Sequence, residues 1–518
     1  MIWRGFLSSS LKIVLLGVLD VISIWTAVSL FSQGNYAFLA ALVIGVGLIN
    51  YLSLSQKAYP FRYLFPGLVF LAAMVVYPLF YTVYISTTNL STGHLLTKQQ
   101  VIEQFESRYF QPPDPQSFRF WTYQNDQGDL KVILSSEDGR TFISQQDHLQ
   151  AIDLSDPRFE RSADGTVERF DDYRRLTLRE LYQNLSTLEK MELRHEDKLV
   201  RLANLRPGEF RTYNKQYRYV AEEDQLIDLQ TGMVYHPEEG YFTVEDGTRL
   251  EPGFRTFIGL GNFTQLATNT RYRQPFLRVF IWTIVWALGS VVFSFALGLG
   301  LAWLLNDPQI RFRFLYRSLL IIPYAIPVFI SALVWRGMFH ADVGVINRVL
   351  QDLVGLKIPW LLDPLWAKVT LIFINVWLTY PYMMIITLGA LQSIPQELYE
   401  AAWVDGASTW QRFSKITMPL LMITVAPLLI GSFAFTFNNF TIIWLVTAGR
   451  PAVPGAEIPA GATDILISLT YRIAFEGQRG NNWALASALS IIIFIIIATI
   501  SAINFRYTRA LEEVSEGV

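Results

Sequence analysis

The sequence predicts an all-α polytopic membrane protein of eight transmembrane helices, with an extracytoplasmic α/β domain inserted between the third and fourth helices. The composition gives the first indication, because 52% of the 518 residues are hydrophobic, more than an ordinary soluble protein of several domains contains. The second is a set of eight apolar runs long enough to cross a bilayer. The third is one long polar stretch, residues 92–276, which separates the third run from the fourth.

The predicted spans each supply about 20 predominantly apolar residues, the length that a bilayer core requires. They lie near residues 12–32, 36–54, 63–86, 277–305, 314–338, 368–393, 418–447 and 483–505. Lys and Arg are in excess in cytoplasmic loops, and here they cluster before the first span, in alternate connections and after the last span. These basic residues are Arg4, Lys12, Lys57, Arg62, Arg311, Arg313, Arg317, Arg412, Lys415, Arg506 and Arg509. We therefore expect a multi-pass membrane protein with both termini in the cytoplasm.

The N-terminal run has two interpretations. Arg4 followed by an apolar stretch is typical of a cleavable signal. However, Asp20 interrupts the stretch, no small-residue cleavage site follows, and a second apolar run comes at once. We therefore expect an anchor helix. An acidic residue inside a bilayer is costly, so Asp20 is expected in a polar contact between helices or near the interface.

Charge is distributed unevenly along the chain. The net charge is -2, but residues 92–276 contain 23 basic and 30 acidic side chains, while the rest contains 19 basic and 14 acidic. No basic stripe with interleaved aromatic residues is present, so nucleic acid is not an expected partner. The absence of cysteine excludes disulfides, thiol nucleophiles and Cys-ligated metals.

Residues 92–276 are too long for a structureless connection. Alternating apolar and polar residues predict a hairpin over Leu130–Ile143, with its turn at 137–139, and further strands over Gln216–Val244. Leucines at helical spacing predict an amphipathic helix over Arg174–Val200. We expect three domains, at 1–91, 92–276 and 277–518. The middle one is either a docking surface for an extracytoplasmic protein or a stabilising insertion without a partner.

A spaced pattern follows the sixth predicted span on its cytoplasmic side. Residues 395–400 start a short helix, and Ala401 and Ala402 keep it thin enough for close approach by a partner. Gly406 permits a tight turn, and Pro419 stands in the first turn of the next span. The segment 395–419 is therefore predicted to form a compact knob between two membrane helices.

This pattern resembles the EAA motif of permeases in ATP-binding-cassette (ABC) importers. The matching positions, with the Asp that precedes the Gly, are Glu400, Ala401, Ala402, Asp405, Gly406, Ile416 and Pro419. In that family the loop couples the permease to a nucleotide-binding subunit. Since this chain has no Walker A sequence, the resemblance implies that the chain is not an enzyme and carries no cofactor. ATP and Mg²⁺ would be bound by a partner ATPase.

Further stretches resemble the maltose/maltodextrin branch of the carbohydrate permeases within this family, and the likeness covers nearly the whole chain. They are residues 257–263, 323–327, 377–378, 380–385, 432–435, 437–440 and 470–477. The resemblance implies a second permease subunit, an ATPase homodimer, a periplasmic sugar-binding protein and an oligosaccharide substrate. It also implies that the protein lies in a bacterial inner membrane.

The same stretches suggest a substrate site on physical grounds. Pro323, Pro327 and Pro381 interrupt backbone hydrogen bonds inside predicted spans, which is tolerated where protein or a water-filled cavity satisfies the freed groups. Aromatic, hydroxyl and amide side chains lie around them, namely Tyr324, Tyr380, Tyr382, Ser432, Thr436, Asn438 and Asn439. A sugar presents apolar C–H faces and hydroxyl groups, which suit this set. Alternatively, such residues hold helices together.

The resemblance assigns particular sugar contacts. The positions that match are Tyr324, Leu378, Tyr382, Ser432, Phe435 and Asn439. Three others depart from the family's best-known member: Val328 replaces Ser, Thr379 replaces Gly, and Thr436 replaces Asn. Each change alters a hydroxyl, an amide or the space along the cavity, so the exact sugar stays open.

The predicted function is a permease subunit that moves a sugar by alternating access, driven by a separate ATPase. An ion-coupled secondary transporter is the main alternative, but it predicts paired acidic residues at mid-membrane, and the predicted spans contain almost none apart from Asp20. A membrane-anchored receptor is a third interpretation, which leaves the knob and the proline-broken spans unexplained.

Overall fold

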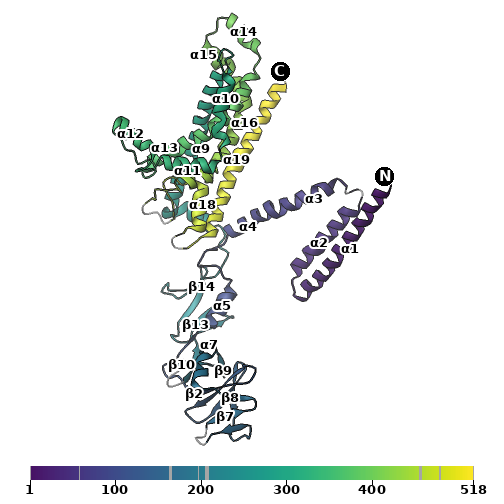
Figure 1. The fold of residues 1–518 in the computed structure, drawn as a ribbon, viewed down its shortest axis with the longest axis vertical. Helices are drawn as coiled ribbons and strands as arrows, with labels where there is room; N and C mark the ends of the chain where they lie inside the picture. Colours follow the sequence, from purple (N-terminus) through teal and green to yellow (C-terminus); the bar gives the residue numbers. More distant parts are fainter. Residues whose placement is uncertain are drawn as a thin grey trace. The chain divides into compact units, whose positions relative to one another are not determined.

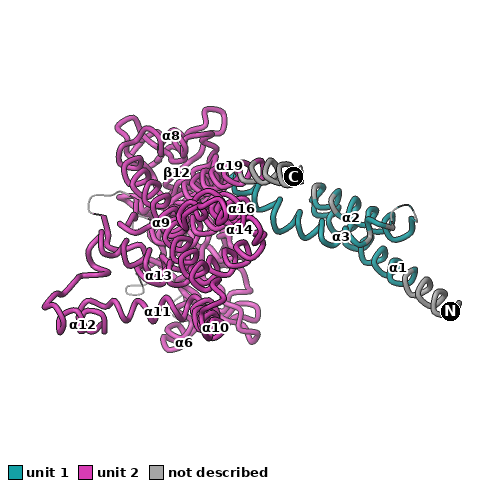
Figure 2. Tube along the Cα trace, turned by 90° about the horizontal axis from the view of Figure 1, so that it is seen from above, with its two compact units in different colours: residues 1–84 teal, residues 85–518 magenta. Residues whose placement is uncertain are grey.

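The computed structural model describes residues 2–55, 57, 59–162, 166–196, 198–204, 209–453, 458–477 and 480–516. The chain forms two compact units, residues 1–84 and 85–518 (Figure 2). Within the described residues, six helices are long and apolar enough to cross a membrane, and a bent pair of helices makes a seventh span if it is counted as one. A polytopic membrane protein is thus confirmed. The span predicted at residues 36–54 corresponds to a shorter apolar helix, α2.

The first unit contains the N-terminal helices. They are α1 (Ile2–Ser32), α2 (Tyr36–Leu54) and α3 (Tyr59–Leu71), followed by a π-helical turn (Ala72–Val76) and the start of α4 (Tyr77–Ser86). The amide Nδ2 of Asn50 on α2 donates a hydrogen bond to Oδ1 of Asp20 on α1 over 2.7 Å. This bond confirms the expected polar contact between helices, because it gives the acidic group a partner within an apolar hairpin.

A separate β-rich domain lies in the second unit, toward the bottom of Figure 1. Its larger sheet comprises β1 (Tyr109–Phe110), β2 (Ser117–Gln124), β3 (Leu130–Ser136), β4 (Thr141–Gln145), β5 (His148–Ile152), β6 (Phe159–Arg161), β7 (Val167–Phe170), β8 (Tyr173–Arg175), β9 (Leu193–His195), β10 (Lys198–Asn204) and β11 (Glu209–Lys215). Because β11 pairs with both β10 and β2, the strands β2, β3, β4, β5, β9, β10 and β11 close into a ring. Buried side chains such as Phe118, Leu134 and Phe210 form a core shared by these strands.

The predicted hairpin over Leu130–Ile143 is confirmed as β3 and β4, which pair in antiparallel register. The predicted long helix over Arg174–Val200 is wrong. Its helical part is confined to α6 (Leu178–Gln183) and α7 (Leu185–Glu189). A capping box between Thr177 and Glu180 begins α6, but beyond α7 the chain pairs as β9 and β10, because sheet hydrogen bonds there override the leucine spacing.

The β-rich domain also contains a smaller antiparallel sheet, which is nearer in sequence to the membrane helices that follow. It contains β12 (Tyr217–Val220), β13 (Gln225–Asp228), β14 (Val234–Glu238), β15 (Tyr241–Thr243) and β16 (Arg249–Leu250), with α5 (Lys98–Glu106) packed against it. The predicted strands over Gln216–Val244 are therefore confirmed. Val101 and Phe105 of α5 are fully buried against Leu226 and Phe242 of the sheet.

The membrane core fills the upper part of Figure 1. Its helices are α8 (Gly261–Thr268), α9 (Thr270–Asn306), α10 (Arg313–Ala325), α11 (Val328–Met338), α12 (Val345–Val354), α13 (Pro364–Gln392), α14 (Gln396–Val404), α15 (Thr409–Arg412), α16 (Met418–Phe437), α17 (Phe440–Val446), α18 (Leu466–Phe475) and α19 (Trp483–Glu516). Helices α9 and α13 pack closely, since a Cβ atom at Gly298 would come within 2.7 Å of Met383 Cβ. This helix pair is the centre of the core.

Candidate functional site: a cavity in the membrane core

A cavity of about 520 Å³ lies among α9, α10, α11, α13, α16 and α17. All nine positions predicted as sugar contacts line it, namely Tyr324, Val328, Leu378, Thr379, Tyr382, Ser432, Phe435, Thr436 and Asn439. None of the described residues along its wall carries a formal charge. The structure therefore brings the predicted site residues together in a single pocket with aromatic, hydroxyl and amide groups.

A broken helix forms one wall of the cavity. Helices α10 and α11 meet at a bend of 90°, where Ile326 is extended and Pro327 precedes the first residue of α11. The bend places Tyr324 beside Tyr382 of α13, with ring centroids 6.3 Å apart and an interplanar angle of 20°. The prolines thus create the irregular backbone that transporter sites commonly use.

A second interruption lies between α16 and α17. Asn438 ends α16, and the side chain of Asn439 caps α17 by accepting a hydrogen bond from the Ile442 amide over 3.4 Å. Phe435, one turn before the break, is 72% exposed. Its ring is therefore available to a ligand that occupies the cavity.

Some hydroxyl groups of the wall are already engaged by protein. Thr379 Oγ1 donates to the Asn375 carbonyl over 2.7 Å and shares a hydrogen bond of 2.6 Å with Ser294. Ser432 Oγ donates to the Leu428 carbonyl over 2.8 Å. The Thr379 side chain consequently contributes volume and a methyl group to the wall more than it contributes hydrogen-bonding capacity.

Two residues missed by the sequence-based prediction have unsatisfied polar groups at this wall. Asn375 is 1% exposed and neither atom of its carboxamide has a partner, and the buried Ser290 hydroxyl is also unpaired. Both line the cavity. A buried polar group without a hydrogen bond costs about 1–3 kcal/mol, so these groups point to a ligand that supplies the missing bonds. Asn375 is the only polar residue in the apolar run from Leu371 to Leu378. This isolated amide was a signal available from the sequence.

The predicted knob lies at the end of the membrane core away from the β-rich domain (Figure 1). Helix α14 carries Glu400, Ala401 and Ala402 on a mostly exposed surface. Gly406 follows with φ of +76°, which only glycine adopts readily. Asp405, also exposed, precedes this turn. The short helix and the tight turn predicted here are therefore confirmed as structural features.

The second half of the knob leads directly into a membrane helix. Ser408 and Gln411 form a capping box at the start of α15, and a π-helical turn (Phe413–Thr417) containing Ile416 joins α15 to α16. Pro419 stands in the first turn of α16. Trp403, Val404 and Trp410 are 70%, 81% and 71% exposed, so the knob presents an apolar surface suited to a partner.

Comparison with known proteins defines the class. Residues 294–512 match the family described as binding-protein-dependent transport system inner membrane component. Residues 69–147 match the family described as N-terminal of TM subunit in PBP-dependent ABC transporters. With the polytopic fold, these matches identify a multi-pass inner-membrane permease subunit of a binding-protein-dependent ABC importer. Such a subunit is a transporter component and not an enzyme, since ATP is hydrolysed by a partner chain.

Relatives identify the family more narrowly. The maltose/maltodextrin transport system permease protein MalF of Yersinia pestis is 34% identical over 510 residues, which cover 97% of this chain and 95% of that protein. The MalF of Vibrio vulnificus (strain YJ016) is 35% identical over 510 residues, covering 96% and 95%. The chain belongs to the MalF family. A chain in the crystal structure of a bacterial alginate ABC transporter in complex with alginate pentasaccharide-bound periplasmic protein is 25% identical, with a TM-score of 0.42 over 49% of this chain and 84% of that one.

Proposed function

We propose that this permease carries maltose, maltodextrin or a related oligosaccharide, and that the sugar binds in the 520 Å³ cavity. The observation that supports this most is the unpaired carboxamide of Asn375 in a cavity wall whose described residues carry no formal charge. Tyr324, Tyr382 and Phe435 supply aromatic faces for the C–H groups of a sugar ring, while Ser432 and Asn439 supply polar partners. The relatives named for maltose and maltodextrin transport support the same class of substrate.

A different sugar of the same general class is the second candidate. Val328 and Thr379 add apolar volume to the wall, and the buried Thr436 presents a hydroxyl instead of an amide. These three positions affect which sugar fits best, without introducing a charge. They therefore bear on the identity of the sugar within the class of neutral carbohydrates.

We further propose eight membrane spans, with α2 and the bent pair α10 and α11 added to the six long apolar helices. In this arrangement both termini and the segment 395–419 lie in the cytoplasm, and residues 92–276 lie in the periplasm. The domains are then 1–91, 92–276 and 277–518. The basic residues of the short connections support this orientation.

The proposed partners follow from this arrangement. A MalG-like second permease completes the pathway in the bilayer, and a MalK-like ATPase homodimer that binds ATP and Mg²⁺ docks on the knob. The coupling positions are Glu400, Ala401, Ala402, Asp405, Gly406, Ile416 and Pro419. A sugar-loaded periplasmic binding protein docks on the opposite side, partly through residues 92–276. Closure of the ATPase dimer then biases the permease between two states that bind sugar differently.

The proposal is tested with the complete importer reconstituted in lipid. ATPase activity is measured with binding protein and a panel of maltose, maltotriose, longer maltodextrins and unrelated disaccharides. Stimulation by the α-glucose oligomers, and loss of their uptake when Asn375 is replaced, would support both the sugar and its site. Stimulation by only an unrelated disaccharide would refute the proposed substrate.

A further inference from the structure

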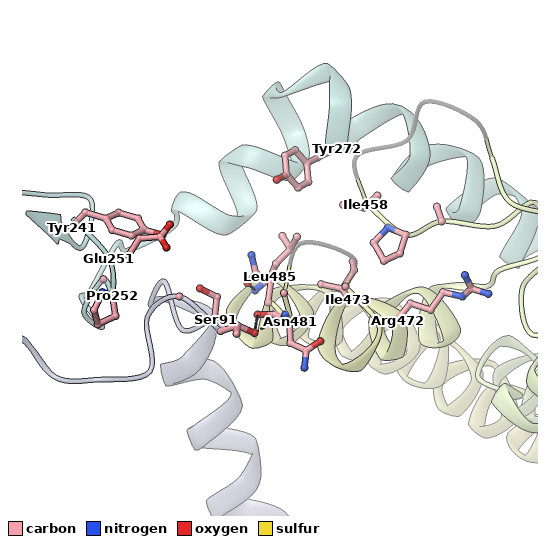
Figure 3. A pocket seen from close by; sticks show the side chains of 18 of the residues that line it. Ser91, Tyr241, Glu251, Pro252, Tyr272, Ile458, Arg472, Ile473, Asn481 and Leu485 are labelled. Atoms are coloured by element: carbon pink, nitrogen blue, oxygen red, sulfur yellow. Dashed lines mark hydrogen bonds between the residues drawn. The ribbon is translucent and has the colours of Figure 1, made fainter. Parts of the chain in front are cut away.

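A second and larger cavity, of about 1030 Å³, lies where the β-rich domain meets the membrane core (Figure 3). The segments that enter and leave this domain, 91–93 and 251–253, form one side of the cavity. Residues 458–460 and the chain around α18 and the start of α19 form the other side. In the orientation proposed above, this cavity is on the periplasmic side, where the substrate arrives.

The wall of this outer cavity is held in place by hydrogen bonds between residues 90–92 and residues 481–484. The Thr92 amide donates to the Asn481 carbonyl over 2.9 Å, and the Asn481 amide donates to Thr92 Oγ1 over 2.8 Å. The Ala484 amide also donates to the Leu90 carbonyl over 3.0 Å. The start of the β-rich domain is therefore fixed against the first turn of α19.

The charges around the cavity do not favour an anion. Among its described lining residues, Glu251 and Arg472 are the only ones with a formal charge. The Arg472 side chain is already engaged, since its Nε lies 3.3 Å from a carboxylate oxygen of the buried Asp464 and its guanidinium also donates to the Ala448 carbonyl. Glu251 would repel an anionic ligand. The chemistry of the wall consequently suits a neutral molecule.

The uncharged groups of the wall are those that bind carbohydrates. Within the described residues, Asn481 makes its hydrogen bonds through its backbone, so its carboxamide is available to a ligand. The rings of Tyr272 and Tyr241 lie on different sides of the cavity (Figure 3), and Ile473 and Leu485 add apolar surface. The inner cavity has the same combination of aromatic rings, amides and aliphatic side chains without a free cation.

We propose that the outer cavity is a second carbohydrate site, which holds a neutral oligosaccharide on the side from which it enters the permease. This inference rests on the proposed function, because the outer cavity is proposed to bind the same class of sugar as the inner cavity. The volume, at the upper end of the usual range of about 300–1,000 Å³ for ligand pockets, accommodates several sugar rings. Asn481 and Tyr272 are its proposed contacts.

The absence of native cysteine makes a direct test possible. The importer is assembled in nanodiscs from cysteine-free partners, without binding protein, and carries Ala452→Cys, at an exposed position of the cavity wall that is not a proposed contact. The rate of alkylation by a membrane-impermeant maleimide is measured with and without maltotetraose. If the sugar covers the site, labelling slows about fivefold at a concentration about four times the Kd, by simple occupancy. Asp138→Cys, in an exposed turn of the β-rich domain, is the control that should label equally under both conditions.

Further variants separate the outer site from an indirect effect of the inner one. Adding Tyr272→Ala or Asn481→Ala to Ala452→Cys should abolish protection by maltotetraose, whereas adding Phe435→Ala, in the inner cavity, should leave it intact. Equal labelling with and without sugar, or protection that disappears with Phe435→Ala, would overturn the outer site. The ATPase rate of the complete importer with binding protein and maltotetraose is measured in a separate experiment. If maltotetraose does not stimulate that rate, the proposed substrate is wrong, whatever the labelling shows.

Discussion

The rings of Trp303 and Phe413 lie with their centroids 5.2 Å apart at an interplanar angle of 35°, which joins the end of α9 to the knob. The ring of Trp410 also stacks on that of Phe413, with the centroids 5.6 Å apart. Helix α9 also lines the outer cavity through Tyr272 and the inner cavity through Ser290. One continuous helix of 37 residues therefore contacts all three proposed sites. It is the simplest rigid connection between the proposed sugar cavities and the knob, where the ATPase is proposed to dock.

The contact between Trp303 and Phe413 should transmit the sugar signal. Phe413→Ala is expected to lower sugar-stimulated ATPase activity about two- to tenfold, because such an aromatic pair contributes about 0.5–1.5 kcal/mol beyond its buried area. The measurement is the ATPase rate of the reconstituted importer with loaded binding protein. Phe494→Ala, which removes an exposed aromatic ring from α19, should leave stimulation unchanged. Equal loss in both variants would refute a specific coupling role.

The backbone turn at Gly406 provides an independent test of the knob. A Cβ atom there would meet nothing within 4 Å, so Gly406→Ala acts through its φ of +76° alone, at a cost of about 1–2 kcal/mol. We expect stimulated ATPase activity and copurification of the ATPase to fall. Gly389→Ala on α13 is the matched control, because that position is equally open but has ordinary helical geometry. Unchanged stimulation in Gly406→Ala would contradict the proposed docking.

Sequence reasoning predicted two candidate sites in the core, the cavity and the knob, but not all of their parts. Pro323 and Pro327 both lack a backbone N–H group within one predicted span, so an interruption of that span could be anticipated. The position of Asn375 could not be judged in the same way, because only the packing of α9 against α13 shows that its amide is buried and unpaired. The contact between Trp303 and Phe413 joins residues 110 positions apart in the sequence, a separation at which local patterns carry no information. The strands β9 and β10 were missed for a similar reason, since their partners supply the hydrogen bonds.

Asn375 should affect stability and transport in opposite directions. Replacing a buried, unpaired amide by an apolar group of similar shape removes a desolvation penalty of about 1–3 kcal/mol. Asn375→Leu is therefore expected to raise the unfolding temperature of the detergent-solubilised importer while it raises the KM for sugar uptake. For loss of a hydrogen bond of about 1–3 kcal/mol to the sugar, the KM rises roughly 5- to 150-fold.

Ser331 supplies the control for this experiment. Its buried hydroxyl is also unpaired, but it is not part of the cavity wall. Ser331→Ala should raise stability modestly and leave the KM as it is. If Asn375→Leu changed stability without changing uptake, the amide would be a structural feature only and the proposed sugar contact would be wrong.

The buried Asp464 predicts an unusual dependence of stability on pH. Its carboxylate accepts hydrogen bonds from the Gly461 amide and the Ser468 hydroxyl and lies beside Arg472, yet burial dominates and raises its pKa from 3.8 to about 6. A folded-state pKa above the unfolded value means that the folded protein binds the proton more tightly. The stability contributed by this group is therefore complete below about pH 4 and is lost as the pH rises through about 6.

Relative to Asp464→Asn, the unmodified importer should thus become more stable by about 2 kcal/mol as the pH is lowered from 7 to 4.5, because this range covers most of a shift of about two pKa units. The difference between the two unfolding temperatures, measured in detergent across this range, reports the effect.

Asp342 should show a dependence of stability on pH of the opposite sign, because its exposed hydrogen bond and ion pair with Lys357 lower its pKa. Asp342→Asn should remove a small stabilising contribution that is present at pH 7 and disappears on acidification. The contrary outcome for Asp464 is that the unfolding temperature of the wild type, relative to that of Asp464→Asn, falls as the pH is lowered. That result would show that the pairing with Arg472, and not burial, controls the charge of Asp464.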